Sequence, residues 1–81
     1  MTDVRLRVEG QIVYLTGEQF KARVLLLIAQ HEPFGITRSR LAEKLGLSLN
    51  DRRLASALFQ LCEQEWRAEL HGRRYTLPYS E

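Results

Sequence analysis

The chain has 81 residues, of which 44% are hydrophobic and 27% are charged. This balance predicts one folded domain over residues 1–81 and excludes a disordered chain. No apolar run approaches the roughly 18 residues that span a bilayer, so we expect no membrane partner. Twelve basic and ten acidic residues leave a net charge of only +2, which permits nucleic-acid binding without requiring it.

The first predicted element is a β-hairpin over 4–15. Residues 4–8 alternate apolar and charged side chains, which is the period of a half-buried strand. Gly10 allows a turn, and the β-branched and aromatic residues 12–15 form the returning strand.

A helix is expected directly after the hairpin, over 17–31. Thr16 and Gln19 have the spacing of a capping box, in which each side chain bonds the backbone of the other residue. The segment is apolar on two sides, so we expect most of it to be buried. Leu26 either packs inside or is exposed to a partner.

A short helix is expected over 38–45. Thr37 can cap its start, because a hydroxyl oxygen accepts a bond from a free backbone N–H. Gly46 can end it, because glycine adopts the left-handed conformation that commonly follows a helix.

The third predicted helix, over 50–66, is amphipathic and is capped by Ser48 or Asn50. Phe59 and Trp66 lie at the border of its two faces. An apolar seam follows the three-and-four spacing of one face: Leu54, Leu58, Leu61 and Cys62. The opposite face is polar: Arg52, Arg53, Ser56, Gln60, Glu63, Gln64 and Arg67.

A second hairpin is expected over 69–77, with Gly72 and Arg73 as its two-residue turn. The order of elements predicts an α+β fold with three helices between two hairpins. A short helix and a tight turn before a longer helix are typical of a helix-turn-helix, and a following hairpin makes it winged.

Three short segments resemble the OmpR/PhoB-type winged-helix effector domain. Residues 15–20 (LTGEQF) resemble the start of its first helix, residues 51–61 resemble its recognition helix, and residues 71–77 (HGRRYTL) resemble its wing. The resemblance covers about 4–77 and implies a transcription regulator that places the third helix in the major groove of double-stranded DNA. The chain departs from the family at 62–65, where Cys-Glu-Gln-Glu replaces basic residues.

The sequence predicts neither an enzyme nor a cofactor. His31 and His71 are 40 residues apart, with no carboxylate or cysteine at ligand spacing, so we expect no metal site. There is no glycine-rich phosphate loop. The lone Cys62 excludes an internal disulfide, is expected to be a small buried hydrophobe, and is typical of the cytoplasm.

The candidate DNA-binding residues belong to the second helix, the third helix and the wing. They are Arg38, Arg40, Arg52, Arg53, Ser56, Gln60, Arg73 and Arg74. Arginine matches phosphates and guanine edges and glutamine matches adenine, so Arg53 and Gln60 are the predicted base readers. The wing arginines are expected on the backbone or in the minor groove. We expect a monomer or a weak homodimer.

The alternative function is a winged helix that binds a protein, as an adaptor or inhibitor of a larger assembly. Glu63 and Glu65 would repel a phosphate backbone. Phe59 beside arginines resembles the hot spot of a protein interface. In this interpretation, Phe59 and the arginine and glutamate face of the third helix form the contact surface.

Overall fold

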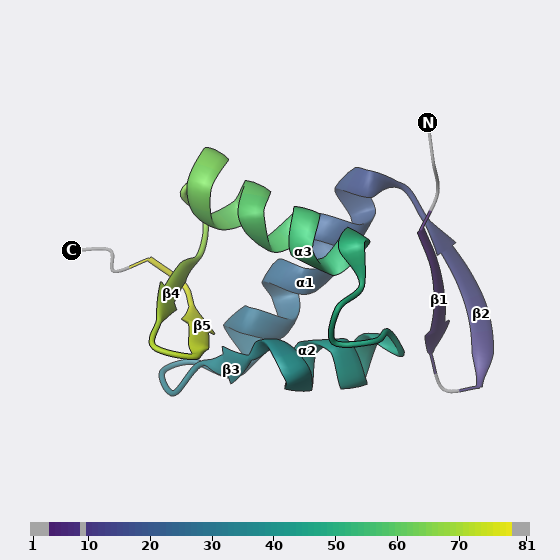
Figure 1. Cartoon of the computed structure of the whole chain (residues 1–81), viewed down its shortest axis with the longest axis horizontal. Coiled ribbons are helices and arrows are strands. Elements are labelled where there is room, and N and C mark those ends of the chain that lie inside the picture. The colour runs from purple at the N-terminus through teal and green to yellow at the C-terminus, as the bar shows by residue number, and fades with distance from the viewer. Residues whose placement is uncertain (1–3, 9, 79–81) are drawn as a thin grey trace.

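The computed structural model describes residues 4–8 and 10–78 (Figure 1). Within them lie three α-helices and two small antiparallel sheets, so the predicted α+β class is confirmed. In chain order the elements are β1 (Val4–Val8), β2 (Gln11–Leu15), α1 (Gly17–Gln30), β3 (Ile36–Thr37), α2 (Arg38–Leu45), α3 (Arg52–Phe59), the π-helical turn η1 (Gln60–Gln64), β4 (Glu69–His71) and β5 (Arg74–Thr76).

The helices form the centre of the molecule, and the two hairpins lie at its opposite ends (Figure 1). β1 and β2 pair along their whole length, so the hairpin predicted over 4–15 is present. Glu9, within it, lies outside the described residues. β4 and β5 form the hairpin predicted over 69–77.

The sequence does not predict β3. Ile36 pairs with Tyr75 and Thr37 pairs with Arg74, so β5 is the middle strand of the sheet β3-β5-β4. Two residues are too few to show the alternation by which a strand is recognised. Through β3, the segment between α1 and α2 is tied to the C-terminal hairpin.

Helix α1 begins with the predicted capping box. The N–H of Gln19 donates to the Thr16 hydroxyl at 3.1 Å, and the N–H of Thr16 donates to the Gln19 side-chain oxygen at 2.9 Å. The helix ends one residue before the predicted 17–31, with His31 as its cap. Leu26 is 50% exposed, so it is available to a partner.

The helix predicted over 38–45 is present as α2. The N–H of Arg40 donates to the Thr37 hydroxyl at 3.3 Å, which caps the start. Gly46 ends the helix with a φ of 70°, and a Cβ there would lie 2.7 Å from the carbonyl oxygen of Arg7. Both the positive φ and the close packing of this turn on β1 therefore require glycine.

The third helix begins later than the predicted 50–66. The cap is Asp51, not Ser48 or Asn50, because its carboxylate accepts the N–H of Arg53 at 2.8 Å. An ionised carboxylate is a strong acceptor for the free N–H groups of a first turn.

The regular part of the third helix also ends earlier, at Phe59, where the chain continues as η1. After η1 the carbonyl oxygen of Leu61 accepts the N–H groups of Arg67 at 2.8 Å and Ala68 at 3.2 Å. Trp66 has a φ of 56°, which reverses the chain direction toward β4. The apolar spacing of the seam continues through η1, so the sequence does not predict this π-helical turn.

The core lies between the helices and the inner sides of the two hairpins. The seam residues Leu54, Leu58 and Leu61 are at most 3% exposed, as predicted, whereas Cys62 is only half-buried. The buried apolar residues among those described are Val4, Leu6, Phe20, Val24, Ile28, Ile36, Leu41, Ala42, Leu45, Leu54, Ala57, Leu58, Leu61 and Ala68.

Leu58→Ala should lower the free energy of unfolding by about 2–5 kcal/mol, because it opens a cavity in the middle of this core. Leu49→Ala is the matched control, since Leu49 is 48% exposed and should cost about 1 kcal/mol or less. Urea unfolding followed by circular dichroism measures both. Equal losses of unfolding free energy in the two variants would contradict the burial of Leu58 in the core.

Candidate nucleic-acid interface

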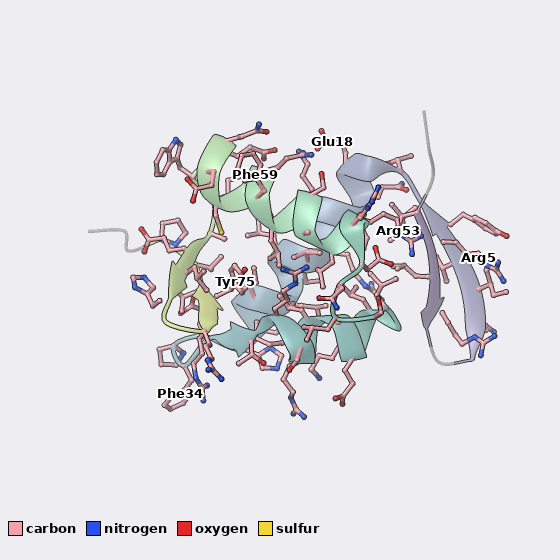
Figure 2. The ribbon with its side chains drawn as sticks, viewed as in Figure 1. Arg5, Glu18, Phe34, Arg53, Phe59 and Tyr75 are labelled. Carbon is pink, nitrogen blue, oxygen red and sulfur yellow. The ribbon has the colours of Figure 1, made fainter. Side chains whose placement is uncertain are left out.

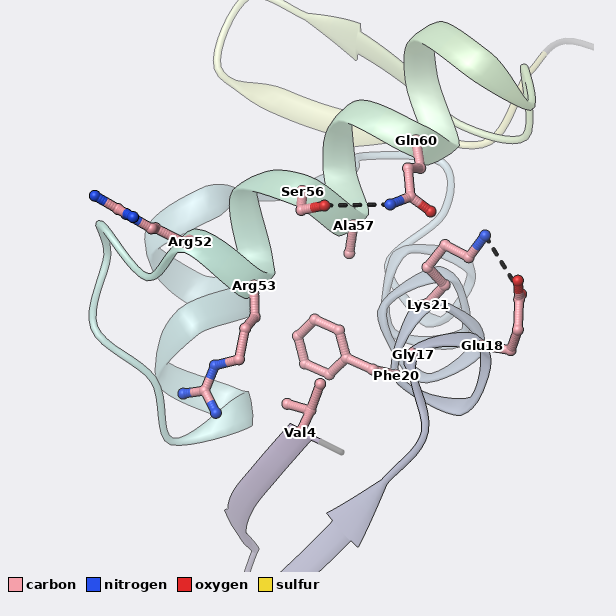
Figure 3. Close-up of a pocket in the computed structure, with 10 residues that line it drawn as sticks. All are labelled: Val4, Gly17, Glu18, Phe20, Lys21, Arg52, Arg53, Ser56, Ala57 and Gln60. Carbon is pink, nitrogen blue, oxygen red and sulfur yellow. Dashed lines mark hydrogen bonds and ion pairs between the residues drawn. The ribbon is translucent and has the colours of Figure 1, made fainter. Parts of the chain in front are cut away.

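The outer face of α3 carries the first group of candidate residues. Arg52 and Ser56 are exposed, and Gln60 is half-buried at the start of η1. Gln60 Nε2 donates to Ser56 Oγ at 3.2 Å (Figure 3). Arg52 points away from the neighbouring helix, and no carboxylate within 4.0 Å pairs with it among the described residues.

A groove of about 430 Å³ runs between this face of α3 and the start of α1 (Figure 3). Val4, Phe20 and Ala57 give it an apolar lining, whereas Glu18 and Lys21 belong to its polar part. One flank of the polar face of α3 therefore borders a hollow.

Arg53 has a different position from the one predicted. Its Nε and Nη2 donate to the two carboxylate oxygens of Asp51 at 3.0 and 2.8 Å, and its Nη1 donates to the carbonyl oxygen of Arg5 at 3.4 Å. Figure 2 shows it between α3 and β1. The hydrogen bonds lower the pKa of Asp51 and raise the pKa of Arg53. Arg53 therefore fastens the start of α3 to the N-terminal hairpin, and base reading by this side chain stays a prediction.

The two arginines of α2 differ in how firmly their side chains are held within the protein. Arg38 Nε donates to the carbonyl oxygen of Leu49 at 3.0 Å, so this side chain braces the turn before α3. Arg40 is exposed, and its Nη1 lies 3.9 Å from Glu43. Such a surface pair contributes little, so Arg40 remains free to bind another anion.

The C-terminal hairpin carries Arg73 and Arg74 at and beside its turn, where Gly72 has a φ of 65°. Both arginines are exposed and have no carboxylate partner among the described residues. On the neighbouring strand, His71 Nε2 lies 3.0 Å from the carboxylate of Glu69.

Across the described residues, carboxylates are mostly paired and basic side chains are mostly not. Of seven carboxylates, four lie within 4.0 Å of an arginine or lysine nitrogen, and Glu69 lies 3.0 Å from His71 Nε2. Glu32 accepts the N–H of Leu77, and Glu63 has no such contact among the described residues. Eight of the twelve lysine and arginine side chains have no carboxylate within 4.0 Å among the described residues: Arg5, Arg7, Arg23, Arg38, Lys44, Arg52, Arg73 and Arg74. Five of the eight belong to α2, α3 and the C-terminal hairpin.

A smaller groove of about 190 Å³ separates α3 from the C-terminal hairpin. Phe59 is 55% exposed and Leu70 is 51% exposed along it. Burial raises the pKa of the Cys62 thiol and of the Tyr75 hydroxyl, so both groups are neutral at pH 7. The sequence predicts Phe59 as a contact residue but does not predict Leu70. A three-residue strand such as β4 is too short to show which of its faces is outward.

Lys21 is a buried cation that the sequence does not single out. Its Nζ lies 3.3 Å from the carboxylate of Glu18 and donates to the carboxylate of Glu65. The hydrogen bond with Glu65 raises the pKa of Lys21 and lowers the pKa of Glu65. This contact joins α1 to the segment that follows η1, so the role of both side chains is structural.

Residues 4–8 and 10–78 contain neither a cluster of metal ligands nor a membrane-spanning helix. No three histidine, cysteine, aspartate or glutamate side chains there are grouped so as to hold a metal ion. No helix in that part of the chain has the length and apolar character needed to cross a membrane.

Comparison of the chain with protein-family models, with curated proteins and with solved structures finds no match in any of the three.

Asp51→Asn should reduce stability at pH 7 and have less effect in acid. Because its pKa is lowered on folding, the carboxylate stabilises the fold above its unfolded pKa of about 4, and this contribution is lost as the pH falls through the folded value. Asparagine keeps the capping oxygen but removes the charge, so we expect a loss of up to about 1 kcal/mol at pH 7.

Urea unfolding at pH 7 and at about pH 2.5 measures this difference. Glu43→Gln is the control, because its exposed ion pair at 3.9 Å should leave stability unchanged at both pH values. A deficit of Asp51→Asn that is equal at the two pH values would contradict the role of the charge.

Proposed function

We propose that the chain is a winged helix-turn-helix domain that binds double-stranded DNA sequence-specifically, as a small transcriptional regulator. The element order α1-β3-α2-α3-β4-β5 supports this fold, because a short helix and a glycine-ended turn precede a second helix and a hairpin. In this proposal α3 is the recognition helix, β4 and β5 form the wing, and β3 completes the wing sheet.

The unequal pairing of charges is the observation that carries the proposal. Most carboxylates are already bound within the protein, whereas five basic side chains of α2, α3 and the hairpin lack a carboxylate partner among the described residues: Arg38, Lys44, Arg52, Arg73 and Arg74. A phosphate backbone complements such a set, and the release of its counterions favours binding. Glu63 has no basic partner among the described residues and would disfavour phosphates near η1, so in this proposal the first half of α3 makes the contact.

Arg52 replaces Arg53 as the proposed base reader, because it is exposed and is not held by Asp51. Its guanidinium can donate two bonds to one guanine. Ser56 and Gln60 bond each other and form a polar pair beside it that can turn to base edges. The residues proposed to contact the backbone or the minor groove are Arg38, Arg40, Arg73 and Arg74.

A second candidate function is the binding of a protein partner. It is favoured by the groove between α3 and β4, where two apolar side chains, Phe59 and Leu70, are each more than half exposed. Arg38 and Glu63 lie at the same groove. An aromatic anchor among charged groups is typical of the energetic centre of a protein interface.

Removal of the wing charges should weaken the binding of every duplex alike. The double variant Arg73→Ala and Arg74→Ala is titrated with short duplexes by fluorescence anisotropy between about 50 and 200 mM salt. We expect the logarithmic salt slope to become shallower by about 2, one unit for each lost phosphate contact. Arg23→Ala is the control, because Arg23 is an exposed arginine on α1, outside the proposed interface.

Arg52→Ala in the same assay separates base reading from phosphate binding. It should cost about 1–3 kcal/mol on the preferred duplex and relax discrimination against others. Absence of duplex binding at low salt, or equal binding by the wild type and both variants, would contradict the proposal. If DNA binding fails in this way and Phe59→Ala abolishes the binding of an isolated protein partner, protein binding replaces DNA binding as the proposed function.

A further inference from the structure

Strand β2 has a free backbone edge, whereas the outer edge of β1 is covered. On β1, the carbonyl oxygen of Arg5 accepts a bond from α3, and that of Arg7 packs against Gly46. Both carbonyls point away from β2, so the opposite residues, Tyr14 and Ile12, direct their own N–H and C=O groups away from β1. Among the described residues, no backbone group beyond the hairpin bonds them.

The free edge lacks the features that protect edge strands from pairing. Its sequence, Gln-Ile-Val-Tyr-Leu, contains no proline and no charge. Ile12 is 44% exposed and Tyr14 is 65% exposed on its outer face. On the inner face, Val13 and the half-exposed Leu26 border an apolar groove of about 330 Å³ between the hairpin and α1. Figure 1 shows β2 on the outer side of the molecule.

We propose that β2 pairs antiparallel with β2 of a second copy of this chain, about a two-fold axis at Val13. In this register Ile12 lies opposite Tyr14 of the second copy, and the two residues exchange both backbone bonds. Tyr14 and Ile12 of the second copy exchange the same two bonds. The four outward N–H and C=O groups of each β2 edge are then all hydrogen-bonded. The outcome is a four-stranded sheet across the dimer.

The side chains on both faces fit the same register. On the outer face, Ile12 meets the aromatic ring of Tyr14, a favourable cross-strand combination. On the inner face, the two Val13 residues form a non-hydrogen-bonded pair, in which facing side chains lie closest. This pair lies beside the groove that Leu26 lines.

The edge of β2 can pair with a second copy of itself without electrostatic repulsion. Because β2 carries no charge, its pairing with itself places no like charges opposite each other. The exposed parts of Ile12, Tyr14 and Leu26 amount to roughly 300–400 Å² per copy, about half of the ~800 Å² per partner in stable interfaces. An interface of this size gives a weak dimer, so association is expected only at high protein concentration.

Disulfide trapping tests the register. In a Cys62→Ser background, Val13→Cys places the two introduced cysteines about 4.5 Å apart between Cα atoms, within the range that a disulfide spans. Gln11→Cys is the matched control on the same strand, because four residue steps separate its two copies by about 14 Å. Mild oxidation should give at least about tenfold more covalent dimer for Val13→Cys. Equal yields, or none from Val13→Cys, would overturn the register.

Sedimentation equilibrium tests the dimer without DNA, so its outcome is independent of the proposed function. The mass of the wild type should rise toward twice that of one chain as the concentration passes from about 10 µM to 1 mM. Ile12→Lys should remain monomeric, because a lysine on the edge disfavours pairing. Phe34→Lys, at an exposed site in the turn between α1 and β3, should behave as the wild type. A wild type that stays monomeric at 1 mM, or a folded Ile12→Lys that dimerises equally, would overturn the proposal.

Discussion

Burial of the apolar seam of α3 is the constraint on which the rest of the molecule depends. Leu54, Leu58 and Leu61 are each at most 3% exposed. Burial of one such side chain contributes about 1.5–3 kcal/mol, whereas an exposed ion pair contributes about 0–1 kcal/mol. The seam therefore outweighs the polar contacts around it and decides which face of α3 is turned outward. Arg52 and Ser56 are exposed because they lie on the side opposite to it.

Polar contacts then set the ends of this helical segment. At its start, Asp51 both caps α3 and orients Arg53, whose guanidinium reaches the backbone of Arg5. Beyond its end, Glu65 accepts a hydrogen bond from Lys21 of α1. The N-terminal hairpin is thus fixed to the start of α3, which covers one edge of the hairpin and leaves the edge of β2 open.

Most of the secondary structure could be predicted because its signals are local. The capping box of Thr16 and Gln19, the cap Thr37 and the terminating Gly46 each act within a few residues. β3 could not be predicted, because its two residues become a strand only by pairing with β5. The π-helical turn was equally hidden, since the apolar spacing continues through it.

The candidate site could be predicted as a group but not residue by residue. Arg52 and Arg53 are adjacent on the polar face, and sequence alone cannot say which is free. That choice depends on Asp51 and on a carbonyl oxygen of Arg5, 48 residues away in the chain. The exposure of Leu70 likewise depends on how β4 packs beside α3.

Mapping of a DNA duplex onto the domain by NMR tests most directly whether α3 and the C-terminal hairpin form one DNA interface. We expect the largest amide shift changes in the first half of α3, at the start of α2 and at the turn around Arg73, with reversal as salt rises. The amides of β2 should not change in a dilute sample. Changes confined to α1 and the N-terminal hairpin, or no changes at low salt, would contradict the DNA interface.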